Sequence, residues 1–332
     1  MYTGGVVLDR SDRDPGFSLI SARGRPRVIA EGLCNVEGPV VGPGGWVLNV
    51  CSLSRPSEDW PTRGGDITAT HPTRPLETRV LLNTSTAAAE GIPAALAFGP
   101  DGCLYVTDEG RRAIVRVQPD GIQADFISEW HGQRINGPND LSFDESGNLY
   151  FTDPWTSSPQ NPVGAVYAYL WQTGELRQLD SGMAFPNGIV ITEGRLYVAE
   201  TYAGKVWLYD VDTPGQATHK REFCSLPPKD IETIHGPDGM AFDREGNLYV
   251  AYYDGGGVFV FSDRGDPIGQ ITTEGHKPTN VCFGGEHHDR LYVTVDDLGE
   301  LVEYDLGVQG QTLNFCPSQI SQHPWATVLG SS

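Results

Sequence analysis

Four polar residues recur at one position in short, similar segments of this 332-residue chain. The segments read VEGPVV, PNDLSF, PNGIVI and PDGMAF, and the residues, which we call the oxygen quartet, are Glu37, Asn139, Asn187 and Asp238. They offer two carboxylates and two amide oxygens, the kind of ligand that Ca²⁺ prefers at about six to eight per ion. Zn²⁺ would favour Cys or His, and neither residue type occurs at these positions. If the fold brings the quartet together, it predicts a calcium site that water or substrate completes.

An internal repeat indicates which elements carry these residues. A turn followed by an apolar–Tyr–apolar strand recurs in GPDGCLYVTDEG, DESGNLYFTDP, TEGRLYVAE, DREGNLYVA and GEHHDRLYVT. A weaker copy, GPGGWVLNV, precedes them. The copies lie roughly 45 residues apart, which is typical of propeller blades. Each copy also contains a short alternating segment before this strand and a third strand after it, so each predicts three or four antiparallel strands.

Six such copies predict an all-β fold, namely a six-bladed β-propeller with a central channel. We expect a single domain over residues 1–332, with blades starting near residues 36, 93, 138, 186, 237 and 278. Residues 1–30 and 308–332 lack the repeat, and we expect them to supply outer strands that close the ring. The sequence does not indicate which terminus supplies which strand.

Alignment of the first strands places one residue of each blade in an equivalent position, which we call the slot. The slot holds Glu37, Ala94, Asn139, Asn187, Asp238 and Thr279. Because the first strand of a blade is the innermost, slot residues converge at the mouth of the channel. Any one of the quartet could be a plain turn residue, since Asn and Asp are common in turns. Their shared register favours a metal site instead. Small residues that allow close backbone approach follow the slot in four blades: Gly38, Ala95, Gly188 and Gly239.

Composition excludes some partners. The net charge of −20 disfavours binding to nucleic acid or to an anionic membrane, because phosphate groups attract clustered Lys and Arg. The chain starts without a basic, apolar leader and contains no run of about 18 apolar residues, so we expect a cytoplasmic protein that does not span a membrane. We expect a monomer or a weak homodimer that acts on a small molecule.

The motifs also resemble those of a known family. The segments VEGPV, RINGPNDLSFDESGNLYFTDP, FPNGIVI, GPDGMAFDREGNLYVA and PTNVCFGG are similar to the gluconolactonase/regucalcin family of six-bladed propellers. The resemblance implies that Glu37, Asn187 and Asp238 hold a divalent metal and that Asn139 lines the site and contacts ion, water or substrate. It further implies hydrolysis of a sugar lactone or a related ester, with Ca²⁺ or with another cation such as Zn²⁺, Mn²⁺, Mg²⁺ or Fe²⁺.

The remaining site residues are assigned by their place near the quartet. Asp238 is the candidate general base, with Glu37 as the less favoured alternative, because a carboxylate beside the ion can take a proton from water. Arg134 and Asn136 precede the slot of their blade and are candidates for substrate contacts. Asp140 and Glu200 are candidates for orienting a ligand, although a turn cap and a salt bridge, respectively, would explain them equally well. Two other functions stay open: a family member with a non-sugar substrate, and a non-catalytic propeller that binds calcium or a ligand.

Overall fold

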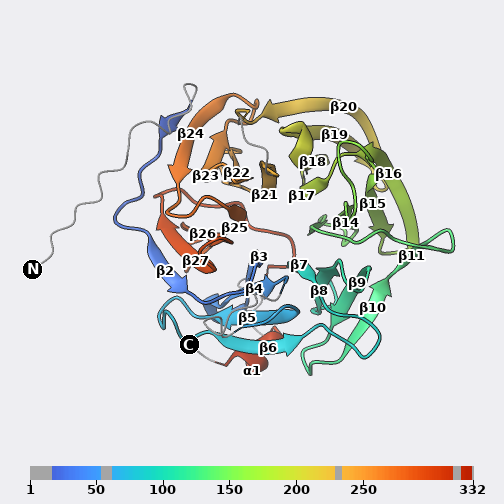
Figure 1. The fold of residues 1–332 in the computed structure, drawn as a ribbon, viewed down its shortest axis with the longest axis horizontal. Helices are drawn as coiled ribbons and strands as arrows, with labels where there is room; N and C mark the ends of the chain where they lie inside the picture. Colours follow the sequence, from blue (N-terminus) through green and yellow to red (C-terminus); the bar gives the residue numbers. More distant parts are fainter. Residues whose placement is uncertain (1–16, 54–61, 229–233, 317–322, 331–332) are drawn as a thin grey trace, which may run out of the picture.

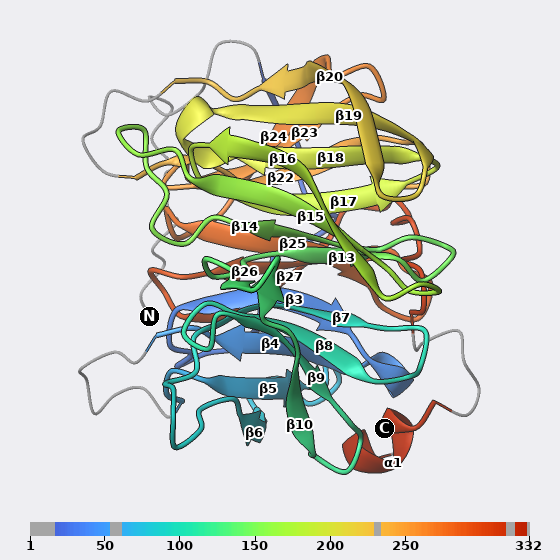
Figure 2. The same cartoon turned by 90° about the vertical axis from the view of Figure 1, so that its right-hand side faces the viewer.

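The protein is described here by a computed structural model over residues 17–53, 62–228, 234–316 and 323–330. Six antiparallel sheets stand around a common axis like blades (Figure 1). Turned by 90°, the sheets are seen stacked one beside another around the ring (Figure 2). The predicted six-bladed β-propeller is therefore confirmed.

In blades one to three the strands follow chain order from the axis outward. Blade one consists of β3 (Val36–Val41), β4 (Val47–Cys51), β5 (Asp66–Thr70) and β6 (Arg79–Asn83). Blade two consists of β7 (Pro93–Phe98), β8 (Leu104–Asp108), β9 (Ala113–Val117) and β10 (Gln123–Ile127). Blade three consists of β13 (Leu141–Phe143), β14 (Leu149–Asp153), β15 (Gly164–Leu170) and β16 (Glu175–Met183). A small hairpin between blades two and three is formed by β11 (Glu129–Trp130) and β12 (Gln133–Arg134).

Blades four to six repeat this order. Blade four consists of β17 (Pro186–Thr192), β18 (Arg195–Glu200), β19 (Lys205–Thr213) and β20 (Gln216–Ser225). Blade five consists of β21 (Gly236–Phe242), β22 (Leu248–Tyr253), β23 (Gly257–Phe261) and β24 (Pro267–Thr272). Blade six contains three strands from the C-terminal part of the chain, β25 (Pro278–Gly284), β26 (Arg290–Val295) and β27 (Glu300–Asp305). Two short 3₁₀ turns, η2 (Pro43–Gly45) and η3 (Thr201–Ala203), lie in blades one and four.

The repeated tyrosine is explained by a bond within the blade. In blades two, three and five the Tyr hydroxyl donates to an aspartate in the turn before the same strand. Tyr105, for example, donates to Asp101 over 3.1 Å, and its ring is fully buried. The aspartate also accepts a backbone N–H of its own turn, as Asp101 does from Cys103. One turn therefore fixes both the hairpin and the aromatic side chain, which is why the two recur together in the sequence.

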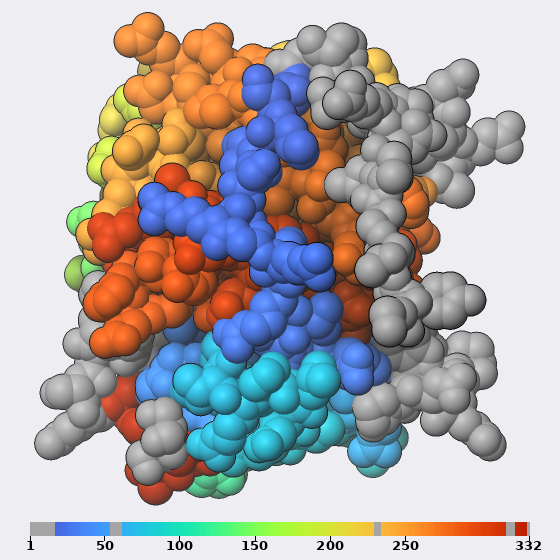
Figure 3. Space-filling model, turned by 90° about the vertical axis from the view of Figure 1, so that its left-hand side faces the viewer, coloured from blue at the N-terminus to red at the C-terminus, as the bar shows by residue number. Residues whose placement is uncertain are grey.

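The N-terminal segment closes the ring. Strand β2 (Arg27–Ala30) pairs antiparallel with β27 and becomes the outer strand of blade six. The pair is reinforced by Arg27, which donates to the Glu303 carboxylate over 2.7 Å. Strand β1 (Ser18–Leu19) adds to blade five in parallel with β24. Figure 3 shows these N-terminal residues, in blue, lying over the outer edges of blades five and six.

The C-terminal segment differs from the expectation, because its described residues add no outer strand. Residues 307–316, the C-terminal crossover, instead run past the ends of inner strands at the rear of the channel. Gln311 bonds to the main chain of Phe242 and to the hydroxyl of Thr192, and Asn314 donates to the Phe143 carbonyl. Helix α1 (Trp325–Leu329) then packs against blades one and two. No helix within the described ranges is long and apolar enough to cross a membrane.

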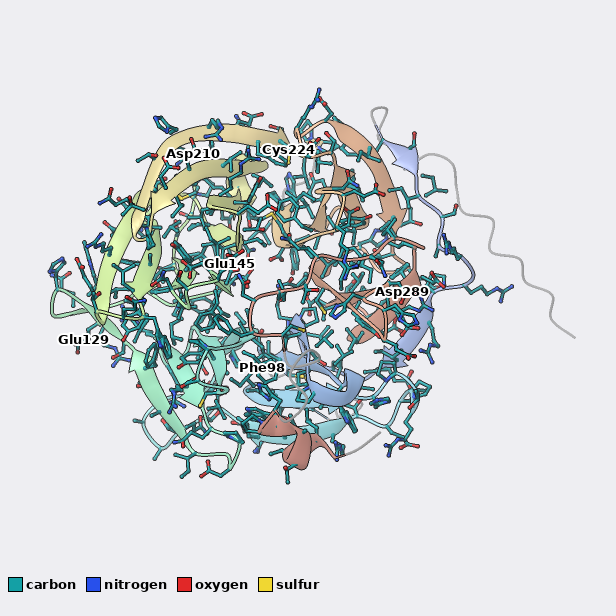
Figure 4. The ribbon with its side chains drawn as sticks, turned by 180° about the vertical axis from the view of Figure 1, so that it is seen from behind. Phe98, Glu129, Glu145, Asp210, Cys224 and Asp289 are labelled. Carbon is teal, nitrogen blue, oxygen red and sulfur yellow. The ribbon has the colours of Figure 1, made fainter. Side chains whose placement is uncertain are left out.

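The hydrophobic core lies between blades rather than at the centre of the ring. Apolar residues form one cluster between each pair of neighbouring blades. This arrangement explains why the middle strands are apolar on both faces, since each blade is covered on both sides. Seen from behind, Phe98 lies near the axis, whereas Glu129 and Asp210 lie at the outer edge (Figure 4).

Inner strands of neighbouring blades approach most closely at the residue after the slot. A Cβ at Gly188 would overlap with the Asp238 carbonyl oxygen, and a Cβ at Gly38 would overlap with the main chain of Ala94 and Ala95. These glycines were expected to let the backbone approach an ion. Their contacts are instead with the next inner strand, so what they permit is the narrowness of the ring itself.

We therefore predict that Gly188→Ala destabilises the propeller. Overpacking of this kind costs about 1–3 kcal/mol of unfolding free energy, because β17 and β21 must separate to admit the methyl group. Urea unfolding of the wild type and the variant measures the difference. Gly121→Ala is the comparison for a surface glycine whose added Cβ meets no neighbour within 4 Å, although its own positive φ of 85° carries some strain. An unchanged midpoint for Gly188→Ala would show that the ring is not tightly packed at this level.

Candidate metal centre

The oxygen quartet lies at the start of the inner strands, where the strands are closest. Glu37 and Asn187 are the second residues of β3 and β17, and Asp238 is the third residue of β21. Asn139 lies two residues before β13, which begins at Leu141 rather than near residue 138. Its N–H still donates to the Thr152 carbonyl of β14 over 3.0 Å, so it keeps the position of an inner-strand residue.

The two carboxylates of the quartet lie close enough to affect each other's protonation. The charge of Asp238 raises the pKa of Glu37, after burial, which is the larger cause. For Asp238, burial again comes first, and the carboxylates of Asp140 and Glu109 add to the increase in its pKa. Glu109 in turn accepts a hydrogen bond from the Asn139 amide nitrogen over 3.0 Å. Contacts between Gly188 and the main chain of Asp238 place Asn187 beside Asp238.

Several buried acids therefore lie close enough to influence one another near the axis. Burial raises the pKa of Glu109 to about 8 and that of Asp140 to about 7. The pKa values of Glu37 and Asp238 are both raised well above the ordinary range for carboxylic acids. Desolvation disfavours the charged form of each acid, and like charges nearby disfavour it further. A cation at this point would relieve both effects at once.

Asn187 adds a more specific indication. Its amide nitrogen donates to the Thr201 hydroxyl over 3.1 Å, whereas its amide oxygen is buried and has no hydrogen-bond partner. A buried polar atom without a partner costs free energy, so such atoms are uncommon unless a ligand satisfies them. An oxygen atom beside two carboxylates is suited to a hard cation.

The donor set fits a divalent, oxygen-preferring cation only when the amides are included. Among the described residues, no group of three or more His, Cys, Asp or Glu side chains is arranged to hold a metal ion. Two carboxylates and two amides make a weaker but chemically consistent set, with room for water or substrate oxygens. Thr279, which occupies the slot of blade six, donates its hydroxyl to the Val36 carbonyl over 2.8 Å and links β25 to β3.

Asp140 and Glu200 are both occupied by hydrogen bonds to other groups. The two carboxylate oxygens of Asp140 accept backbone N–H groups, one from Leu141 over 2.8 Å and one from Ile189 over 3.0 Å. Asp140 thereby joins the inner strands of blades three and four, beneath the quartet. Glu200 accepts from the Ala184 N–H and from the Trp207 indole N–H, each over 2.6 Å. These bonds give both residues a structural task, and any effect of theirs on a ligand stays a prediction.

The two candidates for substrate contacts differ in their surroundings. Arg134 is exposed on β12 and donates to the Arg111 carbonyl over 2.5 Å. Asn136 is held by its main chain, because its N–H donates to the Asp153 carboxylate over 2.8 Å. Its amide oxygen accepts from Thr156, but its amide nitrogen is buried and has no partner. Asn136 therefore offers an unused donor close to the quartet in sequence.

A second layer of residues, not predicted from the sequence, surrounds the quartet. Each of them directly follows the second-strand residue that pairs with the proline before the slot. The layer includes Glu109, Thr201, Tyr253 and Asp296. Glu109 and Thr201 bond to the two amides of the quartet. Tyr253 lies near Asp296 and Asp238, since those carboxylates raise the pKa of its hydroxyl after burial. These positions carry a different residue type in each of the four blades, so the repeat alone does not mark them.

A cavity of about 430 Å³ lies along the axis behind the quartet. It is lined by later residues of the inner strands, by Asp140 and Asn280, and by the C-terminal crossover. No member of the quartet lines it, whereas Gly38 does. The narrow ring of inner strands therefore separates the quartet from the rear part of the channel.

Comparison with known proteins agrees with this architecture. A gluconolactonase of Zymomonas mobilis subsp. mobilis is 31% identical over 230 residues, which is 62% of this chain and 64% of that protein. A diisopropyl-fluorophosphatase of Loligo vulgaris is 33% identical over 209 residues, which is 58% of this chain and 65% of that protein. The chain thus covers less than two thirds of the length of either relative.

Solved structures extend the fold comparison to nearly the whole chain. A calcium-binding protein, regucalcin, of Agrobacterium tumefaciens superposes with a TM-score of 0.71 at 19% identity, over 90% of this chain and 99% of that one. The model of the SMP-30/gluconolactonase/LRE-like region matches residues 66–296, a range that includes three members of the quartet and leaves Glu37 outside. The chain therefore belongs to the SMP-30/gluconolactonase/LRE-like family.

Proposed function

We propose that this protein is a divalent-metal-dependent hydrolase that opens a lactone, a sugar lactone or a related cyclic ester. The observation that carries the proposal is the Asn187 amide oxygen, buried without a partner among acids whose pKa values are raised. The oxygen quartet would hold the cation, and Ca²⁺ is the ion that its donors suit best. The reaction class is supported by relatives named gluconolactonase, lactonase drp35 and pentonolactonase.

The division of tasks follows from the chemistry of the residues. The bound cation would polarise the lactone carbonyl, which contributes several kcal/mol to stabilising the developing negative charge. Asp238 would take the proton from the attacking water, since its carboxylate is the acidic group that borders both Glu37 and Glu109. Glu37 is the alternative base. Both carboxylates accept the N–H of the glycine that follows them, but Glu37 also bonds to the Asn280 side chain, which leaves it less free to turn towards a water molecule.

Substrate would be oriented from blade three. The unused amide donor of Asn136 can bond to a substrate hydroxyl or ring oxygen, and Asn139 would contact both ion and substrate. Arg134 is exposed and would act only at the rim, where its charge can meet a hydroxyl or carboxylate group.

The first prediction concerns metal removal. Hydrolysis of an aldonolactone in a pH-stat panel that also contains aryl esters should stop in EDTA and return with Ca²⁺ or Mn²⁺. The cation should also stabilise the fold, by about 2.7 kcal/mol at a concentration 100 times its Kd, because it binds only the folded site. Metal binding without turnover of any lactone or ester would favour a binding protein. Absence of both binding and turnover would contradict the whole proposal.

The second prediction concerns the base. Asp238→Asn keeps an oxygen ligand but cannot accept a proton, so kcat at saturating metal should fall by about 10²–10⁴-fold. Glu37→Gln is the matched control, because it also removes one negative charge from the quartet. It should weaken metal binding similarly and lower kcat much less. If Asp238→Asn stays active with metal bound, or if Glu37→Gln loses more kcat, the assignment to Asp238 is wrong.

A further inference from the structure

We infer that Thr201 and Glu109 are positioning residues that fix which end of each quartet amide faces the axis. The inference rests on the proposed metal site. Both residues lie in the second layer described above, and neither needs to touch the ion. Thr201 acts on Asn187, and Glu109 acts on Asn139.

The need for such residues follows from the chemistry of the amide group. An Asn side chain has an acceptor oxygen at one end and a donor NH₂ at the other, and a half-turn about its last bond exchanges them. Oxygen towards a cation is a ligand, whereas NH₂ towards it is a repelling dipole. An Asp at the same place would present oxygen in either orientation. A site built with amides therefore requires something that selects the orientation.

At Asn187 the selection is made by a hydroxyl whose proton is already committed. The Thr201 hydroxyl donates to the Pro237 carbonyl over 2.9 Å. A hydroxyl has one proton, so towards Asn187 it can act only as an acceptor. Asn187 must then present its NH₂ to Thr201, over 3.1 Å, and its oxygen is left facing away. That oxygen is the buried atom without a partner.

At Asn139 the selection is made by a carboxylate. Glu109 is 6% exposed and directly follows β8 in the neighbouring blade. Its oxygen lies 3.0 Å from the Asn139 amide nitrogen. Because the NH₂ of Asn139 is the end that donates to this oxygen, the amide oxygen of Asn139 is left facing away from Glu109. The charge of Glu109 also acts on Asp238, which means that its removal would change the electrostatics as well as the orientation.

The Thr201 part is tested by the affinity for Ca²⁺ or Mn²⁺, measured by titration calorimetry. Thr201→Val removes the acceptor at nearly constant volume, and we expect the Kd to rise by about 10–100-fold. Thr201→Ser keeps the hydroxyl, so its Kd should stay within about twofold of the wild-type value, far from the increase expected for Thr201→Val.

Loss of the bond to Pro237 needs its own control, because Thr201→Val removes that bond as well. Thr107 makes a comparable bond between blades, because its hydroxyl donates to the main-chain carbonyl of Asn139. It makes no bond to the side-chain amide of Asn139 or Asn187. The Kd of Thr107→Val should therefore stay within about twofold of the wild-type value, a small change compared with that expected for Thr201→Val. An equal loss in Thr107→Val and Thr201→Val would overturn the inference, since it would reflect blade packing alone.

The Glu109 part is tested by two variants that remove the same charge. The oxygen of Glu109→Gln can still accept from Asn139, whereas Glu109→Leu removes the acceptor entirely. We expect Glu109→Leu to bind the metal at least about tenfold more weakly than Glu109→Gln. Equal affinities would show that Glu109 acts through its charge only, and the positioning role would be rejected.

A double-variant cycle gives the sharpest discrimination. In an Asn187→Asp background both ends of the side chain are oxygen, so orientation no longer matters. Thr201→Val should then change the Kd by about twofold or less, although it costs about 10–100-fold with Asn187 present. Equal costs in both backgrounds would overturn the inference. If the wild type itself binds no divalent cation, it is the proposed function that fails rather than this assignment within it.

Discussion

Close contact between the inner strands is the constraint on which this site depends. Six strands can converge around one axis at the slot only because residues such as Gly188 and Gly38 leave no side chain in the way. Hydroxyl groups then join the blades across the same level, as Thr152 does with the Asn187 carbonyl over 2.7 Å. The starting point of each quartet side chain is thus set by backbone geometry.

The same convergence creates an electrostatic conflict. Carboxylates of Glu37, Asp238 and Glu109 are brought together in a place that water cannot fully solvate, and their pKa values rise accordingly. A protein selected only for stability would avoid such an arrangement. Two of the four quartet members are amides, which lowers the number of buried charges while keeping four oxygen donors. The consequence is that neighbouring groups must control the orientation of each amide side chain.

Much of this could be predicted from the sequence because the fold repeats. The repeat fixes the blade number, and its first strands identify Glu37, Asn187 and Asp238 in one register. Thr201 and Glu109 escaped notice because the ends of the second strands carry a different residue type in each blade, so no pattern marks them. The C-terminal crossover was also missed. Its bonds reach Phe242, Thr192 and Phe143 on three different blades, and contacts of that kind leave no periodicity in a sequence.

Pairing of β2 with β27 has a consequence for how the molecule is made. Arg27 and Glu303 are separated by 276 residues, so blade six lacks its outer strand until the two ends of the chain meet. Contacts so distant in sequence close late and slowly, because the entropy of a long loop must be overcome first. During synthesis β2 must wait for β27, with its edge unpaired. Completion of the ring is therefore a single late event, and the inner strands that carry the quartet gain their full support only then.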